Sequence, residues 1–250
     1  VSKKYGFRVE ILRKIQKCVA KNASIIVVPS EYLKKIVSRW GIDSGKIRVI
    51  YNSFESRDLI LSKDEARKKL DLNGFILVSA GRMVTWKGFD VLNEIMPEIL
   101  KKIPEAKLII IGDGPGKKNL EFSIKNLGLG RAVILTGQFS HEEMINYLKA
   151  GDLFVLNTGY EGLSHNILEA MAVGIPVITT NVGGNPELIN HSESGFLIEY
   201  NNKGKLTKAI ANLYRNESLR NKFIEKSKEK IKDFTKEKMI TDIIKFLNEI

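Results

Sequence analysis

The sequence contains a single cysteine, Cys18, and no long run of apolar residues. One cysteine excludes a disulfide within the chain and a cysteine-based metal site, and it is typical of proteins from a reducing compartment. The longest apolar runs, such as residues 25–28 and 108–111, fall far short of the roughly 20 residues that cross a bilayer. The first residues show no charged segment followed by an apolar stretch, which is the pattern of an export signal. We therefore expect a soluble, cytoplasmic protein.

Histidine is also scarce, with three in 250 residues, and the patterns of common metal sites do not occur. The sequence has no Asp-x-Asp triplet and no His-x-x-x-His pair, so a metal would find no obvious set of ligands. His141 and His165 are not paired with the signature of a serine or cysteine nucleophile, and we interpret both as polar residues at helix starts. We expect neither a metal nor a bound cofactor.

Positive charge is concentrated at the two ends of the chain. Residues 1–50 carry 12 Lys and Arg against 3 Asp and Glu, and residues 201–250 carry 13 against 7. The ends therefore contribute +9 and +6 to the net charge of +11, and the middle 150 residues contribute −4. If the ends meet in space they form one positive surface, which we interpret as solvated helix faces or as contact with the anionic inner face of a membrane. A nucleic-acid partner is not expected, because no zinc finger, aromatic RNA-binding strand or basic zipper supports one.

The chain opens with a helical pattern and one strand–helix–strand unit. Apolar spacing predicts a helix over residues 7–20, and the runs at 24–29 and 46–50 flank a helix at 31–39. Two parallel strands with one crossover helix cannot bury a sheet. We therefore expect residues 1–52 to be the end of an N-terminal domain whose earlier part is absent.

The second expected domain covers residues 53–235 and begins with an irregular linker, which we place at 52–61. Apolar runs there alternate with helical patterns, which predicts an α/β fold with a doubly wound parallel sheet. The expected strands cover residues 75–79, 106–111, 132–135, 152–156, 175–179 and 195–198. We expect residues 236–250 to form a last amphipathic helix.

Two glutamates, Glu161 and Glu169, lie between the expected strands 152–156 and 175–179. Ser164 is a good N-cap, so Glu161 is expected in the loop at the carboxyl end of a strand, and Glu169 about one and a half turns into a helix. Open parallel sheets bind ligands at this edge. Eight helical residues rise about 12 Å, so one extended ligand could contact both carboxylates.

Two cations, Arg82 and Lys87, flank the turn between the strand at 75–79 and the next helix. A diphosphate is well matched by such a pair, because arginine offers a forked contact and lysine a point charge at the start of a helix. Taken alone, the pair fits ordinary loop charge equally well. Its expected position on the same edge of the sheet as the two glutamates favours a binding site.

Three glycine-containing turns follow other strands. Gly112-Asp-Gly-Pro-Gly-Lys117 lacks the spacing of a phosphate loop and the third glycine of a dinucleotide fingerprint, so we favour a plain turn over backbone contact with a ligand. Gly137 and Phe139 could lie beside a planar base, although Phe139 fits a core or lid position equally well. The glycines of Asn181-Val-Gly-Gly-Asn-Pro-Glu187 permit close approach of a ligand, and Glu187 favours the dipole of its own helix.

Five motifs in this order resemble the retaining nucleotide-sugar glycosyltransferases of the GT-B fold, group-four type. They are Gly81-Arg82 with Lys87-Gly88, Ile110-Ile-Gly-Asp-Gly-Pro115, Glu161-Gly-Leu followed after five residues by Glu169-Ala, Gly174-Ile-Pro-Val177, and Gly183-Gly-Asn-Pro-Glu187. The two glutamates alone are a weak signal, but the ordered set over about 110 residues is specific.

The resemblance implies roles for particular residues. Arg82 and Lys87 would hold the donor diphosphate, Glu169 the ribose hydroxyls and Glu161 the transferred sugar. The donor cradle would be completed by the amides of Gly162, Leu163 and Ser164. The spelling Leu163-Ser164-His165 departs from the commoner aromatic-glycine sequence, which bears on the identity of the donor sugar. The resemblance also implies that the last helix returns to the N-terminal domain.

The expected activity is transfer of a hexosyl group from a nucleoside diphosphate sugar to an acceptor hydroxyl, with retention and without a metal. The acceptor would be a saccharide or a lipid-linked saccharide in polysaccharide or glycolipid assembly. Glu161 is better placed to orient sugar hydroxyls than to attack, but a double displacement with two carboxylates stays open. Two other interpretations are a donor-binding half that is inactive without a partner and a sugar-nucleotide epimerase.

Overall fold

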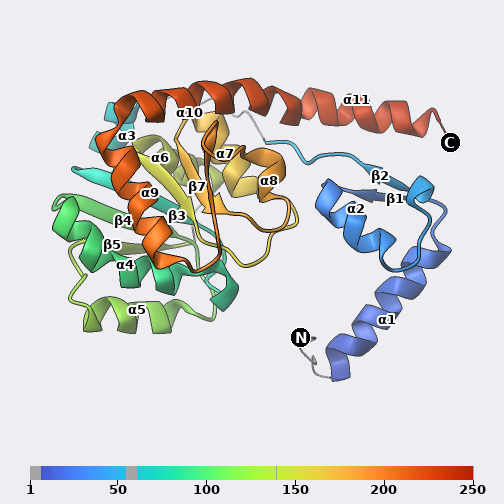
Figure 1. Cartoon of the computed structure of the whole chain (residues 1–250), viewed down its shortest axis with the longest axis horizontal. Coiled ribbons are helices and arrows are strands. Elements are labelled where there is room, and N and C mark those ends of the chain that lie inside the picture. The colour runs from blue at the N-terminus through green and yellow to red at the C-terminus, as the bar shows by residue number, and fades with distance from the viewer. Residues whose placement is uncertain (1–6, 55–60, 139, 250) are drawn as a thin grey trace.

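The computed structural model describes residues 7–54, 61–138 and 140–249, and it places two separate parallel sheets in this part of the chain (Figure 1). Of the predicted linker at 52–61, residues 55–60 lie outside the described residues. The smaller sheet pairs β1 (Ile26–Val28) with β2 (Ile47–Val49), and α2 (Glu31–Ser38) connects them, followed by the 3₁₀ turn η1 (Ser44–Lys46). The predicted βαβ unit is therefore present.

The N-terminal helix α1 (Phe7–Asn22) precedes this unit and contributes no buried residue. The small core beneath β1 and β2 consists of Val28, Val37, Ile42 and Ile47. Ser30 caps α2 by accepting a hydrogen bond of 3.1 Å from the backbone N–H of Leu33. A core of this size is far smaller than that of a typical domain, as expected for two strands and one crossover helix.

The larger sheet has six parallel strands in the order β5-β4-β3-β6-β7-β8. They are β3 (Phe75–Ala80), β4 (Ala106–Ile111), β5 (Val133–Gly137), β6 (Leu153–Leu156), β7 (Val177–Thr180) and β8 (Gly195–Ile198). All six residues of β3 are buried, which explains why its sequence is a continuous apolar run without alternation. The predicted doubly wound parallel sheet is confirmed.

Helices follow the strands in alternation. They are α3 (Lys63–Lys69), η2 (Thr85–Lys87), α4 (Phe89–Lys102), α5 (Lys117–Asn126), α6 (His141–Ala150), α7 (His165–Val173), α8 (Asn185–Leu188), α9 (Lys203–Arg215), α10 (Glu217–Lys230), η3 (Ile231–Phe234) and α11 (Lys236–Leu247). Helix α10 ends at Lys230. The 3₁₀ turn η3 follows and buries Ile231 and Phe234.

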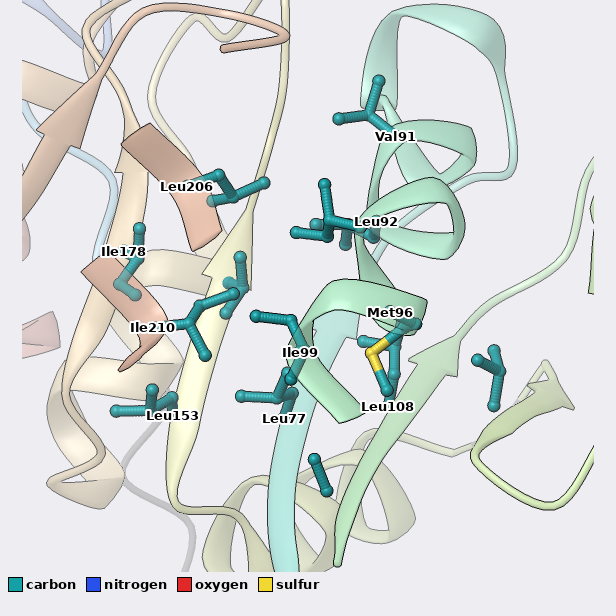
Figure 2. Packing of buried hydrophobic residues seen from close by; sticks show 14 of the residues in the cluster. Leu77, Val91, Leu92, Met96, Ile99, Leu108, Leu153, Ile178, Leu206 and Ile210 are labelled. Carbon is teal, nitrogen blue, oxygen red and sulfur yellow. The ribbon is translucent and has the colours of Figure 1, made fainter. Parts of the chain in front are cut away.

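Helices cover both faces of the larger sheet, because successive strand residues point to opposite sides. Figure 2 shows the first face, where Leu77, Leu108 and Leu153 of three strands contact side chains of α4 and α9. On the second face, α6 and α7 pack over a cluster that includes Ile76 and Val78. Each fully buried leucine or isoleucine contributes roughly 1.5–3 kcal/mol through removal of its surface from water. The two faces together form the core that fixes the strand order.

The strand order reverses at β3. From β3 the chain moves outward through β4 to β5, and it then returns to place β6 on the other side of β3. Connections on the two sides of such a point leave a crevice at the carboxyl ends of the central strands, where α/β proteins bind ligands. The residues that follow β3 and β6 are therefore brought to one place.

The C-terminal segment leaves the larger unit after η3. The backbone N–H of Phe54 donates to the carbonyl of Phe234 at 3.2 Å, and the rings of Tyr51 and Phe234 lie 5.1 Å apart. From there α11 extends toward the end of the molecule that holds β1 and β2, and it has no buried residue (Figure 1). The proposed domain boundaries at 52 and 235 stay a prediction. No helix among the described residues is long and apolar enough to cross a membrane.

Candidate functional site

Lys87 and Glu161 form an ion pair at the carboxyl ends of β3 and β6. Lys87 is the last residue of η2, and Glu161 lies in the loop after β6. Their side chains are 14% and 13% exposed, so water screens the pair much less than a surface pair. Removing one partner would leave the other charge largely buried, which typically costs several kcal/mol.

The loops that carry this ion pair are bonded to each other through their backbones. The carbonyl of Trp86 accepts hydrogen bonds from the N–H of Gly159 at 2.7 Å and from the hydroxyl of Thr158 at 3.3 Å. Buried Asn157 donates through Nδ2 to the carbonyl of Gly88, the residue after η2, at 3.3 Å. These contacts fix η2 against the loop after β6, so the positions of Lys87 and Glu161 are set before any ligand binds.

The loop between β7 and α8 packs against the backbone of Glu161. Gly183 has a φ of +60°, and a Cβ atom there would lie 1.8 Å from the carbonyl oxygen of Glu161. The N–H of Gly184 donates to the same oxygen at 3.1 Å. The backbone of Glu161 and Gly162 occupies the space that a Cβ atom at either glycine would take, which by itself requires glycine at both positions. Close approach of a ligand to these glycines stays a prediction.

A cleft of about 740 Å³ opens at the carboxyl ends of β3 and β4. Lys87 and Glu161 do not line it, but Lys87 lies against Gly81 of its lining, where a Cβ atom would be 3.3 Å from Lys87 Cε. Its lining includes the exposed side chain of Arg82, the backbone of Gly112 and Gly114, and side chains of His141 and Asn166. Residues 112–116 form the connection from β4 to α5, in agreement with the turn interpretation. The alternative of backbone approach to a ligand stays open, because two of these glycines border the cleft.

Glu169 lies on α7, and its carboxylate contacts His141 at the start of α6. The distance from His141 Nε2 to Glu169 Oε1 is 3.0 Å, and the Glu169 side chain is 12% exposed. The other oxygen, Oε2, is buried and has no hydrogen-bond partner among the described residues. Burial raises the pKa of Glu169, and the nearby His141 partly counteracts this rise. The charged carboxylate thus depends on a hydrogen-bond donor from the cleft side.

The remaining predicted site residues lie around these groups. Gly162 faces α2, since a Cβ atom there would lie 3.0 Å from Leu33 Cδ1. Leu163 and Ser164 are buried, and the Ser164 hydroxyl caps α7 by accepting from the N–H of Ile167 at 3.4 Å. Gly137 ends β5, next to Gln138 of the cleft lining. The predicted site residue Phe139 lies outside the described residues.

The sequence interpretation missed three contacts of the site. His141 and His165 do lie at helix starts, as expected, but the contact of His141 with Glu169 was not foreseen. Asn166 donates to the carbonyl of Ala80 at 2.7 Å and so ties α7 to the end of β3. No sequence pattern indicates either contact, because each joins residues at least 28 positions apart.

The third missed contact joins Glu187 to the start of α2. The Glu187 carboxylate accepts hydrogen bonds of 2.9 Å from the backbone N–H groups of Glu31 and Tyr32, and one of 3.0 Å from the hydroxyl of Tyr51. The carboxylate therefore binds the N-terminus of α2, where unpaired N–H groups favour an anion, although we expected it to serve the dipole of its own helix. It joins the segment before residue 54 to the loop that supports Glu161.

Comparison with known proteins places this geometry in a family. The sequence profile described as "Glycosyl transferases group 1" matches residues 62–230. An uncharacterised glycosyltransferase of Methanocaldococcus jannaschii is 31% identical over 193 residues, which are 75% of this chain and 47% of that protein. The UDP-Gal:alpha-D-GlcNAc-diphosphoundecaprenol alpha-1,3-galactosyltransferase of Escherichia coli is 30% identical over 177 residues, 68% of this chain and 45% of that protein. The chain spans about half the length of these curated relatives.

Solved structures show the same fold. Sucrose-phosphate synthase from Thermosynechococcus elongatus superposes with a TM-score of 0.88 at 24% identity, covering 100% of this chain and 64% of that one. HepE of Anabaena in complex with UDP gives a TM-score of 0.85 at 23% identity, with 98% and 69% coverage. The GT-B fold and the glycosyltransferase family expected from the five motifs are thereby confirmed, and the retaining type stays a prediction. The chain belongs to the group 1 glycosyl transferases, with the parallel α/β sheet of the GT-B glycosyltransferases.

Proposed function

We propose that this chain forms the donor site of a retaining hexosyltransferase that takes its sugar from a nucleoside diphosphate sugar. The observation that supports the proposal is that the Lys87–Glu161 ion pair and the Arg82-lined cleft both lie at the carboxyl end of β3, where the strand order reverses. Both cations lie where an anionic ligand would enter such a fold. The acceptor would be a saccharide or lipid-linked hydroxyl, and the proposal assigns no metal.

Arg82 and Lys87 act on the leaving group in this mechanism. When the anomeric C–O bond breaks, its electron pair goes to the diphosphate. The new bond forms to the acceptor oxygen, and the proton of that hydroxyl passes to the leaving diphosphate. The charge that develops on the diphosphate is stabilised by fixed cations more in the transition state than in the ground state. Lys87 is already held in place by Glu161, so little reorganisation is needed.

The carboxylates bind the two ends of the donor. Glu161 orients hydroxyls of the transferred sugar, with the amides of Gly162, Leu163 and Ser164 beside it. Glu169 accepts hydrogen bonds from the ribose hydroxyls. Gly137 would lie beside the base, because the next residue, Gln138, lines the cleft.

The names of relatives support a uridine diphosphate sugar as the first donor to test. The Escherichia coli relative is named for UDP-Gal and a diphosphoundecaprenol acceptor, and HepE was solved with UDP-glucose. We propose by analogy a role in polysaccharide or glycolipid assembly in the cytoplasm. The exposed apolar residues of α1 and α11, among basic ones, support attachment to an anionic membrane face.

Nucleotide binding tests this function first. We expect UDP-glucose, UDP-galactose or a related donor to raise the melting temperature of the chain, because a ligand that binds only the folded state stabilises it. In Lys87→Ala and Glu161→Ala, turnover should fall by about 100-fold or more, the usual cost of losing one transition-state donor. Glu98→Ala, which removes an exposed helical ion pair with Lys102, is the matched control and should keep full activity. Wild-type turnover in either site variant contradicts these roles.

The length of the relatives favours one alternative, a donor-binding half that needs further residues for transfer. In that case the chain binds a nucleotide sugar but transfers nothing to any acceptor. Incubation of the protein with the donor alone, followed by NMR of the sugar, distinguishes an epimerase, the third interpretation, from a transferase. An epimerase would convert the sugar without an acceptor, whereas a transferase would leave it unchanged or hydrolyse it slowly.

A further inference from the structure

His141 lies between the cleft and the carboxylate of Glu169. The histidine is 34% exposed and lines the cleft, whereas Glu169 does not line it and is 12% exposed. Nε2 of the histidine contacts the carboxylate oxygen Oε1, and Oε2 is buried without a partner among the described residues. A ligand that takes over Oε1 of this carboxylate from the cleft must therefore displace the imidazole.

The two residues differ in their freedom to move. Glu169 is in the middle of α7 and lies between Leu168 and Ala170, which are fully buried. His141 is the first residue of α6, so rotation of its side chain toward solvent disturbs no core contact. When the carboxylate changes its partner, the histidine is the residue that moves.

We infer that His141 is an internal competitor of the nucleotide ribose. In the free protein its imidazole holds the carboxylate of Glu169, and the ribose hydroxyls of a nucleoside diphosphate displace it. This inference rests on the proposed function, in which Glu169 binds the ribose. The buried carboxylate has a hydrogen-bond donor both in the free protein and in the nucleotide complex, so the exchange leaves no carboxylate oxygen newly unpaired. The ribose must nevertheless displace the imidazole, and this weakens nucleotide binding. Weaker binding speeds release of the diphosphate product, a step that limits many enzymes.

Calorimetric titration with UDP tests the competition. His141→Ala should bind UDP about threefold to tenfold more tightly than the wild type, since the ligand no longer has to break the contact with Glu169. The affinity for 2′,3′-dideoxy-UDP should change less than twofold, because that analogue has no hydroxyls to replace the imidazole. His191→Ala, an exposed histidine that accepts from the N–H of Leu197, is the matched control and should bind both ligands as the wild type does.

A spectroscopic readout follows the imidazole directly. The sequence has three histidines, so the ring ¹⁵N signals of His141 can be resolved from those of His165 and His191. Saturation with UDP should shift the Nε2 signal of His141 toward that of a solvated ring, and the dideoxy analogue should not. An unshifted His141 signal in the UDP complex, or equal or weaker UDP binding by His141→Ala, overturns the inference alone. Failure of wild-type protein to bind any of UDP, GDP and ADP overturns the proposed function and this inference with it.

Discussion

Substitution of Gly183 by alanine tests whether the contact of Gly183 with the carbonyl of Glu161 holds the loop after β6 in place. The added Cβ atom would lie 1.8 Å from the carbonyl oxygen of Glu161, whereas real Cβ atoms keep at least 3.0 Å. The loop that carries Glu161 must therefore move by at least about 1.2 Å, which stretches the hydrogen bond from Gly184 beyond its normal range. A φ of +60° adds the cost of left-handed backbone, roughly 1–2 kcal/mol for an alanine.

Gly128→Ala is the matched control for backbone strain. Gly128 has a φ of +66°, and a Cβ atom there meets nothing within 4 Å. We expect Gly128→Ala to lower the free energy of unfolding by about 1 kcal/mol, because strain is partly offset by reduced entropy of the unfolded chain. Gly183→Ala should cost about 2–4 kcal/mol more than the control, from the lost hydrogen bond and the forced shift.

Urea denaturation gives both stabilities, and titration with the nucleotide sugar that binds the wild type gives the functional effect. A displacement of about 1 Å at a positioned group typically costs about 100-fold in rate, so Gly183→Ala should also lose most of its turnover or donor binding. If the free energies of unfolding of the two alanine variants differ by less than about 0.5 kcal/mol, which is near the error of the method, the contact with Gly183 does not hold this loop.

Two further predictions concern carboxylates. Glu187→Ala removes two hydrogen bonds at the N-terminus of α2, each worth roughly 1 kcal/mol in a partly exposed setting, and a third from the hydroxyl of Tyr51. Amide exchange at Glu31 and Tyr32 should accelerate by about 30-fold or more, and unchanged exchange would show that this contact does not hold the helix. Burial raises the pKa of Glu169, so the folded state holds that proton more tightly than the unfolded chain does. Stability should therefore fall as the pH rises from about 4.3 through the raised value, and Glu169→Gln should lack this loss in pH-dependent denaturation; a parallel pH profile would contradict it.

The strands were predictable because strands buried on both faces are continuous apolar runs. The run at 75–79 became β3 with one residue added, since Ala80 continues the ladder with Ile111 of β4. The strand predicted at 132–135 extends to Gly137, because β4 supplies hydrogen-bonding partners that the polar sequence does not reveal. Boundaries of this kind depend on the neighbouring strand, and the local sequence does not contain that neighbour.

The sequence predicted at which edge of the sheet the site lies, but not which side chains contact each other there. Arg82, Lys87 and Glu161 follow strands, and alternation of strands and helices places all such loops on one side. The partners within that edge were not predictable: Lys87 and Glu161 are 74 residues apart, and Glu187 and Glu31 are 156 apart. The first pair depends on β6 lying beside β3, and the second depends on how the start of α2 packs against the loop after β7.

Sequence alone determined the class of fold, the edge that carries the polar residues and the family, because apolar periodicity, turn glycines and motif order are local properties. Tertiary structure decided which charged side chains form ion pairs and that His141 contacts the carboxylate of Glu169. It also decided that the glycines after β7 pack against the backbone of Glu161 and Gly162. The physical reason is that burial against both faces of the sheet sets the strand order. Contacts between distant loops exist only once that order is fixed.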